Sequence, residues 1–301
     1  MDNTAKSRRV GSAGVNLCVH EHSSWSPGKQ SVVLVHGYPD QQDMWGRVIA
    51  EVDHELLHIV TYDVRGAGSS DSPADTAGYR TENLVDDLVA VVHETVPDGG
   101  QFHLVGHDWG SVQLWDAVAA EHTDPRLRGR VASFTSISGP SLDHAATLSR
   151  NNKGRRLRLL AQSARSWYIY AFHLPVLPEL LWSHAGLISK VSGADHIGEQ
   201  ASRNAVNGLG LYRANFVRRM RHPGVLRTDV PVQVVHPTRD RFVSEVMLED
   251  LDLECSRLSV VRVDAGHWFP RSHPEQLADL VSDHIRRNPA DPGDRSARLR
   301  S

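Results

Sequence analysis

Gly106-His107-Asp108-Trp109-Gly110-Ser111 (GHDWGS) follows the short apolar run 102–105 (FHLV) and precedes an apolar stretch at 112–120. The run is too short for a buried helix and favours a strand, whereas the stretch after it favours a helix. A G-x-nucleophile-x-G elbow requires this strand–turn–helix context, because the sharp turn leaves no room for a Cβ on either side. We therefore expect Asp108 to project above the carboxyl end of a sheet.

Strand-like and helix-like segments alternate along most of the chain. Short apolar runs predict strands at 31–35, 57–62, 102–105, 131–137, 230–235 and 258–263. Helical spacing of apolar residues appears between them, as at 83–95 and 276–285. The alternation predicts an α/β fold, with a mostly parallel sheet flanked by helices on both faces. In such sheets, chemistry gathers at the carboxyl ends of the strands.

Residues 141–227 interrupt this rhythm, because they lack strand-like runs and are rich in arginine, leucine and aromatic residues. We interpret them as a helical lid (cap) inserted into a core domain formed by residues 10–140 and 228–288. A structural extension without function is the alternative interpretation. The polar ends at 1–9 and 289–301 are expected to be disordered tails.

The composition excludes several classes of function. The 301 residues are 40% hydrophobic and 23% charged, which is ordinary for a soluble globular protein. A net charge of -3 indicates neither a nucleic-acid-binding surface nor a membrane-surface patch. No segment approaches the ~20 apolar residues of a membrane span, and no secretory signal is recognised at the N-terminus. Cys18 and Cys255 are expected to be free thiols in a cytoplasmic protein. The oligomeric state is left open, a homodimer included.

Further polar residues follow other predicted strands. His36-Gly37-Tyr38-Pro39 comes after the strand at 31–35, where the backbone N–H of Tyr38 would form an oxyanion hole with that of Trp109. Asp240 and His267 each follow a later strand, so we expect both at the same sheet edge as Asp108. The order nucleophile, acid, histidine is the order that such an elbow uses. Taken singly, each residue has a plainer interpretation, as a helix cap, a turn residue or one of 18 histidines.

Over roughly residues 10–287, the motifs HGYP, RGAGSSD (Arg65–Asp71), GHDWGS and AGHWFP together resemble the epoxide hydrolases of the α/β-hydrolase superfamily. The resemblance implies that Asp108 opens an epoxide and forms a covalent glycol ester. It also implies that His267, oriented by Asp240, activates the water that hydrolyses this ester to a vicinal diol.

Epoxide hydrolases of this type carry two lid tyrosines that donate protons to the epoxide oxygen. The resemblance assigns these roles to Tyr168, before FHLP, and to Tyr212, in Tyr212-Arg213-Ala214-Asn215, with Tyr170 less favoured than Tyr168. Packing in the lid core is the alternative role. The residues expected to bind a small hydrophobic epoxide are His36, Tyr38, Trp109, Trp167, Phe172 and Trp268. The sequence FHLPVLPE departs from the usual lid motif and resembles the hydrolase portions of certain actinobacterial proteins.

Haloalkane dehalogenases share the aspartate nucleophile and often GHDWG itself, so they form the leading alternative. They hold a halide ion with N–H donors, which Trp109 and Trp182 would supply, although Tyr38 occupies the place of their usual asparagine. A catalytically inactive binding module is a further alternative. No cofactor or metal is expected, because the histidines of His20-Glu21-His22 would face solvent and no third ligand is evident.

Overall fold

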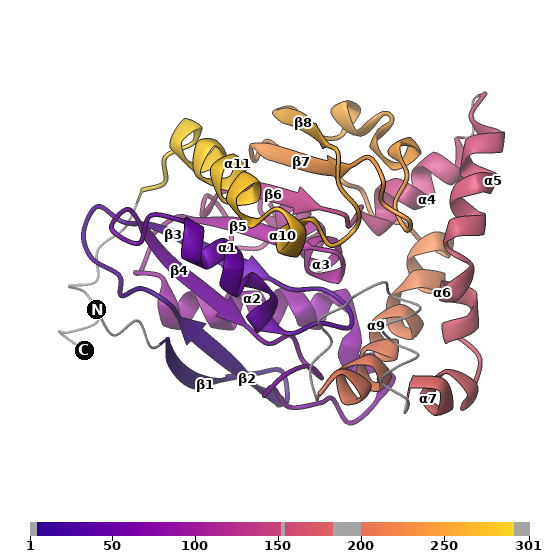
Figure 1. Ribbon diagram of the computed structural model, residues 1–301, viewed down its shortest axis with the longest axis horizontal. Helices are drawn as coiled ribbons and strands as arrows, with labels where there is room; N and C mark the ends of the chain where they lie inside the picture. The colour runs from indigo at the N-terminus through magenta and orange to yellow at the C-terminus, as the bar shows by residue number, and fades with distance from the viewer. Residues whose placement is uncertain (1–4, 152–153, 183–199, 292–301) are drawn as a thin grey trace.

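The computed structural model describes residues 5–151, 154–182 and 200–291, and it confirms the predicted fold class (Figure 1). Its strands form one eight-stranded sheet in the order β1-β2-β4-β3-β5-β6-β7-β8. β2 pairs antiparallel with both β1 and β4, and the other neighbouring strands are parallel. This mostly parallel sheet flanked by helices is the α/β-hydrolase fold.

The strands are β1 (Lys6–Ser12), β2 (Val15–Glu21), β3 (Gln30–Val35), β4 (Leu57–Tyr62), β5 (Phe102–His107), β6 (Val131–Ile137), β7 (Val232–Pro237) and β8 (Leu258–Val263). All six predicted strands are present. β1 and β2 were not predicted, because β1 is a mostly polar edge strand stabilised by its backbone pairing with β2.

The helices are α1 (Gly46–Glu51), α2 (Thr81–Thr95), α3 (Trp109–Ala120), α4 (Leu142–Arg150), α5 (Arg156–Arg165), α6 (Trp167–Phe172), α7 (Leu177–Trp182), α9 (Ala201–Arg221), α10 (Phe269–Ser272) and α11 (Pro274–Arg287). Short 3₁₀ helices are η1 (Gln42–Trp45), η2 (Thr76–Tyr79), η3 (Glu245–Leu248) and η4 (Leu251–Leu253). Alternate residues of β3 enter two cores on opposite faces of the sheet, one with α2 and α3 and the other with α1 and α11. Both cysteines are buried free thiols, as predicted.

The two predicted tails need correction. β1 begins at Lys6, so the N-terminal tail predicted over residues 1–9 is too long. At the other end, the N–H of Ala290 donates to Oε1 of Gln30 at 2.6 Å, and the N–H of Gln101 donates to the carbonyl of Asp291 at 2.7 Å. These bonds fix the start of the predicted tail 289–301 against the sheet. Residues 1–4 and 292–301 lie outside the described residues.

Helices α4, α5, α6, α7 and α9 lie between β6 and β7 in the chain and stand together at one end of the sheet (Figure 1). We call these helices the cap. The division at 141 and 227 into a separate domain stays a prediction, and its residues 152–153 and 183–199 are outside the described part of the chain. In that described part, no helix combines the length and apolar character that crossing a bilayer needs.

Helix α9 is fixed to the core by an asparagine and a glycine. The Asn215 side chain accepts a hydrogen bond from the N–H of Thr81 at 2.9 Å and donates one to the carbonyl of Tyr79 at 2.8 Å. One turn earlier, Gly210 lies on the Tyr79 ring, where a Cβ would come within 2.4 Å of Cδ2. The position of α9 therefore depends on residues of the core.

Candidate active site

Asp108 stands between β5 and α3 in the predicted elbow. Its φ of 51° and ψ of -123° are strained for a residue with a side chain and persist only where the surroundings enforce them. Those surroundings are close: a Cβ on Gly106 would lie 2.7 Å from the backbone of Ser111, and one on Gly110 would lie 2.0 Å from the carbonyl of Val35. The glycines therefore allow β5, α3 and β3 to meet at the turn that raises Asp108 above the sheet.

The Asp108 carboxylate is held by the loop after β3. The backbone N–H of Tyr38 donates to its Oδ1 at 2.8 Å, and Gly37 leaves the space for this approach. Trp109, the other expected oxyanion donor, is the first residue of α3. The Asp108 side chain thus stands at a helix N-terminus, where free backbone N–H groups and the helix dipole attract anionic ligands.

His267 lies between two carboxylates. Its Nδ1 is 3.0 Å from Oδ2 of Asp240, and its Nε2 is 3.6 Å from Oδ2 of Asp108. The first distance is a hydrogen bond, which assigns the Nδ1 proton to that bond. The second is longer than a hydrogen bond but within ion-pair range. Residues that follow β5, β7 and β8 thus converge on one imidazole.

The two carboxylates shift the pKa of this imidazole. Burial alone would lower the pKa of His267, but the charge of Asp240 and the interactions with Asp108 outweigh burial and raise it to about 10. Burial likewise raises the pKa of Asp240, but the charge and hydrogen bond of His267 dominate and bring it to about 2. The resting site therefore favours an imidazolium beside an ionised Asp240.

Two neighbours that the sequence did not single out hold this pair. The N–H of Phe242 donates to Oδ1 of Asp240 at 2.8 Å, and its ring stands edge-on to His267 at 4.7 Å. His107 lies under the site, with Nε2 at 2.9 Å from the carbonyl of His267. Burial and the charge of His267 lower the pKa of His107 to about 4, so a neutral ring donates to that carbonyl. Their only sequence signal is adjacency to Asp240 and Asp108.

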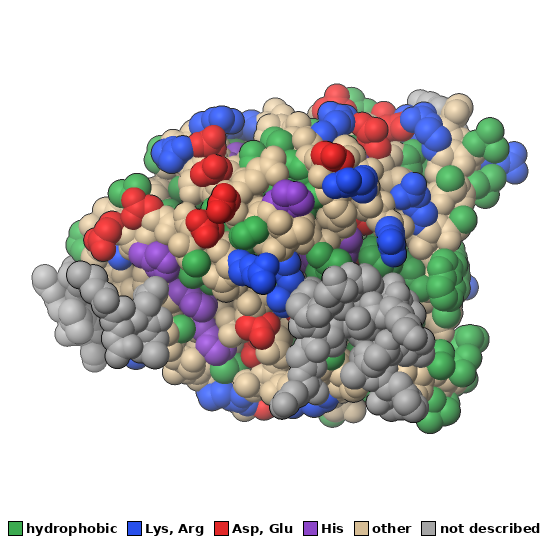
Figure 2. Space-filling view, in the orientation of Figure 1, with side chains coloured by type: hydrophobic (Ala, Val, Ile, Leu, Met, Phe, Trp, Pro, Cys, Tyr) green, Lys and Arg blue, Asp and Glu red, His purple; other side chains and the backbone are tan. Residues whose placement is uncertain are grey.

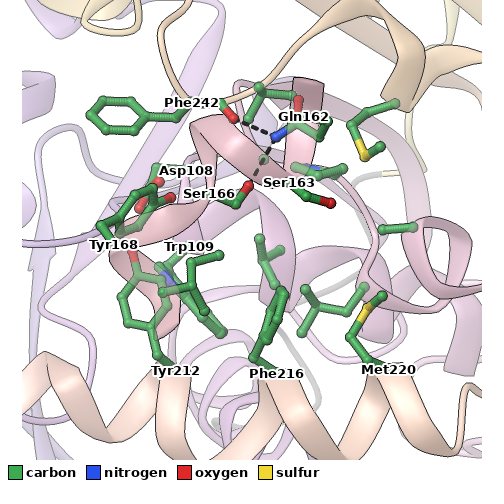
Figure 3. Close-up of a pocket in the computed structure, with 18 of the residues that line it drawn as sticks. Asp108, Trp109, Gln162, Ser163, Ser166, Tyr168, Tyr212, Phe216, Met220 and Phe242 are labelled. Carbon is green, nitrogen blue, oxygen red and sulfur yellow. Dashed lines mark hydrogen bonds between the residues drawn. The ribbon is translucent and has the colours of Figure 1, made fainter. Parts of the chain in front are cut away.

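A glutamine of the cap, which the sequence analysis did not predict, fixes the loop that carries Asp240. The Gln162 side chain donates to the carbonyl of Phe242 at 2.7 Å (Figure 3). It also accepts from the N–H of Ser244 at 2.8 Å. Arg165 donates to the carbonyl of Asp240 itself at 2.8 Å. Helix α5 therefore positions the candidate acid loop as well as covering it.

Tyr168 and Tyr212 stand on the cap side of Asp108 (Figure 3). Their ring centroids are 6.0 Å apart at 83°, and both residues border the same cavities as Asp108. Burial, with the charge of Asp108, raises the pKa of Tyr168, and burial also raises that of Tyr212, so both phenols stay protonated. Tyr170 is 61% exposed and packs against Phe216, and it borders only the larger of the two cavities.

Two cavities meet at Asp108. The larger, about 140 Å³, lies among α4, α5, α6 and α9, and the smaller, about 40 Å³, lies towards His267. The larger is lined mainly by apolar residues, among them Val112, Leu142, Leu159, Ile169, Phe216, Met220, Val243 and Met247. The smaller is lined by aromatic residues that include Tyr38, Phe172, Trp182 and Trp268. Asp108, Tyr168, Tyr212 and Phe242 border both.

Four of the six predicted substrate-binding residues line these cavities, namely Tyr38, Trp109, Phe172 and Trp268. The other two need correction. His36 is buried, and its Nε2 accepts from the N–H of Val64 at 2.9 Å, so the ring supports the loop after β3. Trp167 is 61% exposed on α6 and lines neither cavity.

The histidines near the start of the chain differ from expectation. Instead of facing solvent, His20 is half-buried and lies 3.3 Å from Sγ of Cys18. Asp63 completes a group of candidate ligand atoms that lie within 4.8 Å of one another. However, the Asp63 oxygens accept the backbone N–H groups of Gln42 and Ser69, so this carboxylate fixes two loops. The expectation of no metal stays a prediction.

The chain was compared with known protein families and curated proteins. The family described as "Alpha/beta hydrolase family" matches residues 32–280. A Mycobacterium tuberculosis protein named "Probable oxidoreductase EphD" is 34% identical over 289 residues, which are 90% of this chain and 48% of that protein. This chain thus spans about half the length of that relative. Epoxide hydrolase 3 of Xenopus tropicalis is 23% identical, with 92% of this chain and 77% of that protein covered.

Solved structures give a matching fold. An epoxide hydrolase from Bacillus megaterium in complex with an inhibitor superposes with a TM-score of 0.74 at 21% identity, covering 93% of this chain and 100% of that one. Epoxide hydrolase VrEH1 from Vigna radiata gives a TM-score of 0.74 at 19% identity, covering 95% and 99%. At these identities, the similarity establishes a shared fold only.

Proposed function

Because the chain belongs to the alpha/beta hydrolase family, we propose that it hydrolyses an epoxide to a vicinal diol, with Asp108 as nucleophile. One arrangement carries the proposal: the Asp108 carboxylate has an imidazole–carboxylate pair on one side and two protonated phenols on the other. Epoxide opening needs the phenols, and hydrolysis of the ester that follows needs the imidazole–carboxylate pair. Relatives and structural neighbours named as epoxide hydrolases support the proposal at low identity.

In the first step, an Asp108 oxygen attacks an epoxide carbon and the C–O bond of the ring breaks. The released oxygen is an alkoxide and a poor leaving group unless a proton reaches it. Tyr168 and Tyr212 keep their protons because burial raises the pKa of both phenols, so both can hydrogen-bond this oxygen and one can donate to it. The product is a glycol ester on Asp108.

Alkylation then changes the charge next to His267. The ester of Asp108 is neutral, so one of the charges that raised the pKa of His267 is lost. The imidazolium can give up its proton, which restores the phenol that protonated the alkoxide and leaves the imidazole neutral. With its Nδ1 proton bonded to Asp240, the ring then offers Nε2 as a base.

In the second step, Nε2 of His267 takes a proton from water while the oxygen attacks the ester carbonyl. The backbone N–H groups of Tyr38 and Trp109 hold the oxyanion that forms. When the C–O bond of the ester breaks, His267 returns the proton to the departing diol oxygen. The Asp108 carboxyl group that forms gives its remaining proton to His267, which restores the imidazolium and leaves Asp108 with one carboxylate oxygen derived from water.

The cavities suggest the shape of the substrate. The larger is apolar and the smaller aromatic, and they meet at Asp108. An epoxide with a larger hydrophobic substituent on one side and a smaller one on the other fills both. The preferred substrates are therefore expected among unsymmetrical hydrophobic epoxides.

Haloalkane dehalogenation is less favoured, because the indoles of Trp109 and Trp182, which would hold the halide together, border different cavities. Trp109 borders the larger cavity and Trp182 the smaller one, and Trp109 shares a hydrogen bond with the hydroxyl of Tyr212. A deciding experiment incubates the protein with styrene, cyclohexene and fatty-acid epoxides and with 1-haloalkanes. We expect diol without halide release. Halide release alone would transfer the chain to the dehalogenases, and inactivity towards every compound would support a binding module.

A further inference from the structure

The outer face of the cap is apolar. Large hydrophobic side chains project from α5, α6 and α7 into solvent, with Leu157 81%, Leu160 57%, Trp167 61% and Leu177 50% exposed. Figure 2 shows hydrophobic side chains along the edge of the molecule where Figure 1 places these helices. Soluble monomers rarely expose contiguous apolar patches of this kind, and such patches mark interaction sites. We call the exposed side of α5–α7 the cap face.

The cap face is also basic. Residues 154–182 contain four arginines and one glutamate, a formal charge of +3, although the whole chain carries -3. Helix α5 has no acidic residue. Arg155 pairs with Glu249 and Asp250 of the core, and Arg158 also pairs with Glu249. Arg156 is exposed and has no ion-pair partner among the described residues, so it carries a positive charge of α5 that no described carboxylate neutralises.

Basic and apolar residues on one surface favour a particular partner. Helices that lie in the plane of a bilayer interface combine arginine or lysine with leucine and tryptophan, because the apolar side chains enter the acyl region while the cations meet anionic headgroups. Tryptophan and tyrosine prefer this interface, since they are apolar with one polar end. Trp167 and Tyr170 on α6 are both 61% exposed.

The larger cavity opens at the same place. Ser163 of α5 and Tyr170 of α6 are exposed and also border this cavity, whose inner end is Asp108. We propose that the cap face docks on an anionic lipid bilayer, so that the larger cavity opens towards the membrane. If the proposed function holds, a lipophilic epoxide would enter directly from the bilayer.

A second copy of the chain is a less suitable partner. In a twofold-symmetric dimer through this face, each α5 would meet arginines of its partner, and like charges oppose such contact. The same contact would cover the exposed residues at the mouth of the cavity. Self-association is therefore treated as an outcome of the test.

The test is sedimentation of the full chain with vesicles of phosphatidylcholine, alone or mixed with phosphatidylglycerol. We expect tighter binding to the mixed vesicles, and binding about tenfold weaker for the L157S/L160S variant, which removes two apolar contacts. Arg156→Gln should weaken binding to mixed vesicles about fivefold and leave binding to phosphatidylcholine unchanged. Leu56→Ser is the matched control, because Leu56 is 56% exposed just before β4, at the amino-terminal end of that strand, and should have no effect.

Two further measurements separate the outcomes. Brominated lipid should quench part of the tryptophan emission, and Trp167→Phe should abolish that part. The L157S/L160S variant should hydrolyse a water-soluble epoxide like the wild type when vesicles are absent. Vesicle binding therefore tests docking alone, and epoxide hydrolysis in solution tests the proposed function alone. Docking is overturned if the wild type fails to bind vesicles, if L157S/L160S binds like the wild type, or if ultracentrifugation reveals a dimer that this variant dissociates and vesicles do not bind.

Discussion

Nε2 of His267 lies 3.6 Å from the Asp108 carboxylate, while Nδ1 of the same ring is bonded at 3.0 Å to Asp240. The two carboxylates differ in access, because Asp108 borders both cavities and Asp240 borders neither. A substrate can therefore reach Asp108 and change its charge, while Asp240 keeps its charge and its bond to the ring. The pKa of His267 therefore responds to alkylation of Asp108, while the Asp240 side of the ring stays unchanged.

Asp108 is predicted to be alkylated in every turnover. In ¹⁸O-water, the label should enter the Asp108 peptide after several cycles, because ester hydrolysis places a water oxygen in the carboxylate. Peptide mass spectrometry measures it. Label found in the diol from the first turnover and never in the peptide would contradict the covalent route. Asp108→Asn tolerates the positive φ and should reduce diol formation at least about a thousandfold while leaving thermal unfolding cooperative.

His267→Gln is expected to accumulate the glycol ester. Alkylation precedes water activation, so the variant should react once and then stop. Intact-protein mass spectrometry should show an adduct of one substrate mass, which the wild type clears. A folded variant that turns over normally, or that never gains mass, would remove His267 from the role of base.

The two cap tyrosines should contribute jointly to alkylation. Loss of one oxyanion-type donor costs on the order of 10²–10³ in rate, and less where a neighbour remains. Tyr168→Phe and Tyr212→Phe should each retain part of the pre-steady-state alkylation rate, and the double variant should lose nearly all of it. Tyr170→Phe is the control and should alkylate normally. Full activity of the double variant would refute the assigned roles.

The raised pKa of His267 predicts a pH dependence of stability. A group whose pKa is higher in the folded state stabilises the fold fully below its unfolded value of about 6.5, and this stabilisation is lost as pH rises towards about 10. Urea unfolding of the wild type should thus show a falling free energy across this window. Asp108→Asn removes one of the two charges, so its His267 should titrate at lower pH by NMR and its free energy should fall less. Identical titration in both proteins would exclude the coupling.

Gln162→Leu is predicted to disturb the acid loop from the cap side of the larger cavity. The substitution leaves the carbonyl of Phe242 and the N–H of Ser244 without their cap partner, at a cost of about 1–3 kcal/mol in unfolding free energy. We expect kcat to fall and the pH profile to shift, because Asp240 is less firmly held. Ser163→Ala is the control for stability, since the one bond of the Ser163 hydroxyl within the described part of the chain goes to the carbonyl of Leu159 in its own helix.

The elbow and the strand ends were predictable because they depend on local patterns. GHDWGS lies between an apolar run and an apolar helix, and the polar residues at Asp240 and His267 each follow a strand. The roles of His107, Phe242 and Gln162 were not predictable, since each depends on a contact made through space. The same reason explains the errors at His36 and Trp167, whose neighbours in sequence line the site although their own side chains do not.

The charge pattern shows the limit of composition. A sum over 301 residues gives -3, and only the folded structure shows that Arg155 and Arg158 lie against carboxylates of the core while Arg156 is exposed without a described ion-pair partner. β1 shows a similar limit, because a polar segment became a strand through pairing that its own residues do not signal.

Gly210 packs α9 against the Tyr79 ring of the core, and this attachment divides the cap into two parts that can change independently in evolution. Tyr212 belongs to the part anchored on the core, whereas Leu159 and Ile169, which line the larger cavity, belong to helices outside that attachment. Substitutions at Leu159 and Ile169 can therefore reshape the room for a substituent without moving the proton donor on α9, as long as Tyr168 and Gln162 of the same helices are kept. Such a separation lets specificity diverge among descendants while the chemistry is inherited unchanged, and it recommends Leu159 and Ile169 as the positions to randomise in directed evolution.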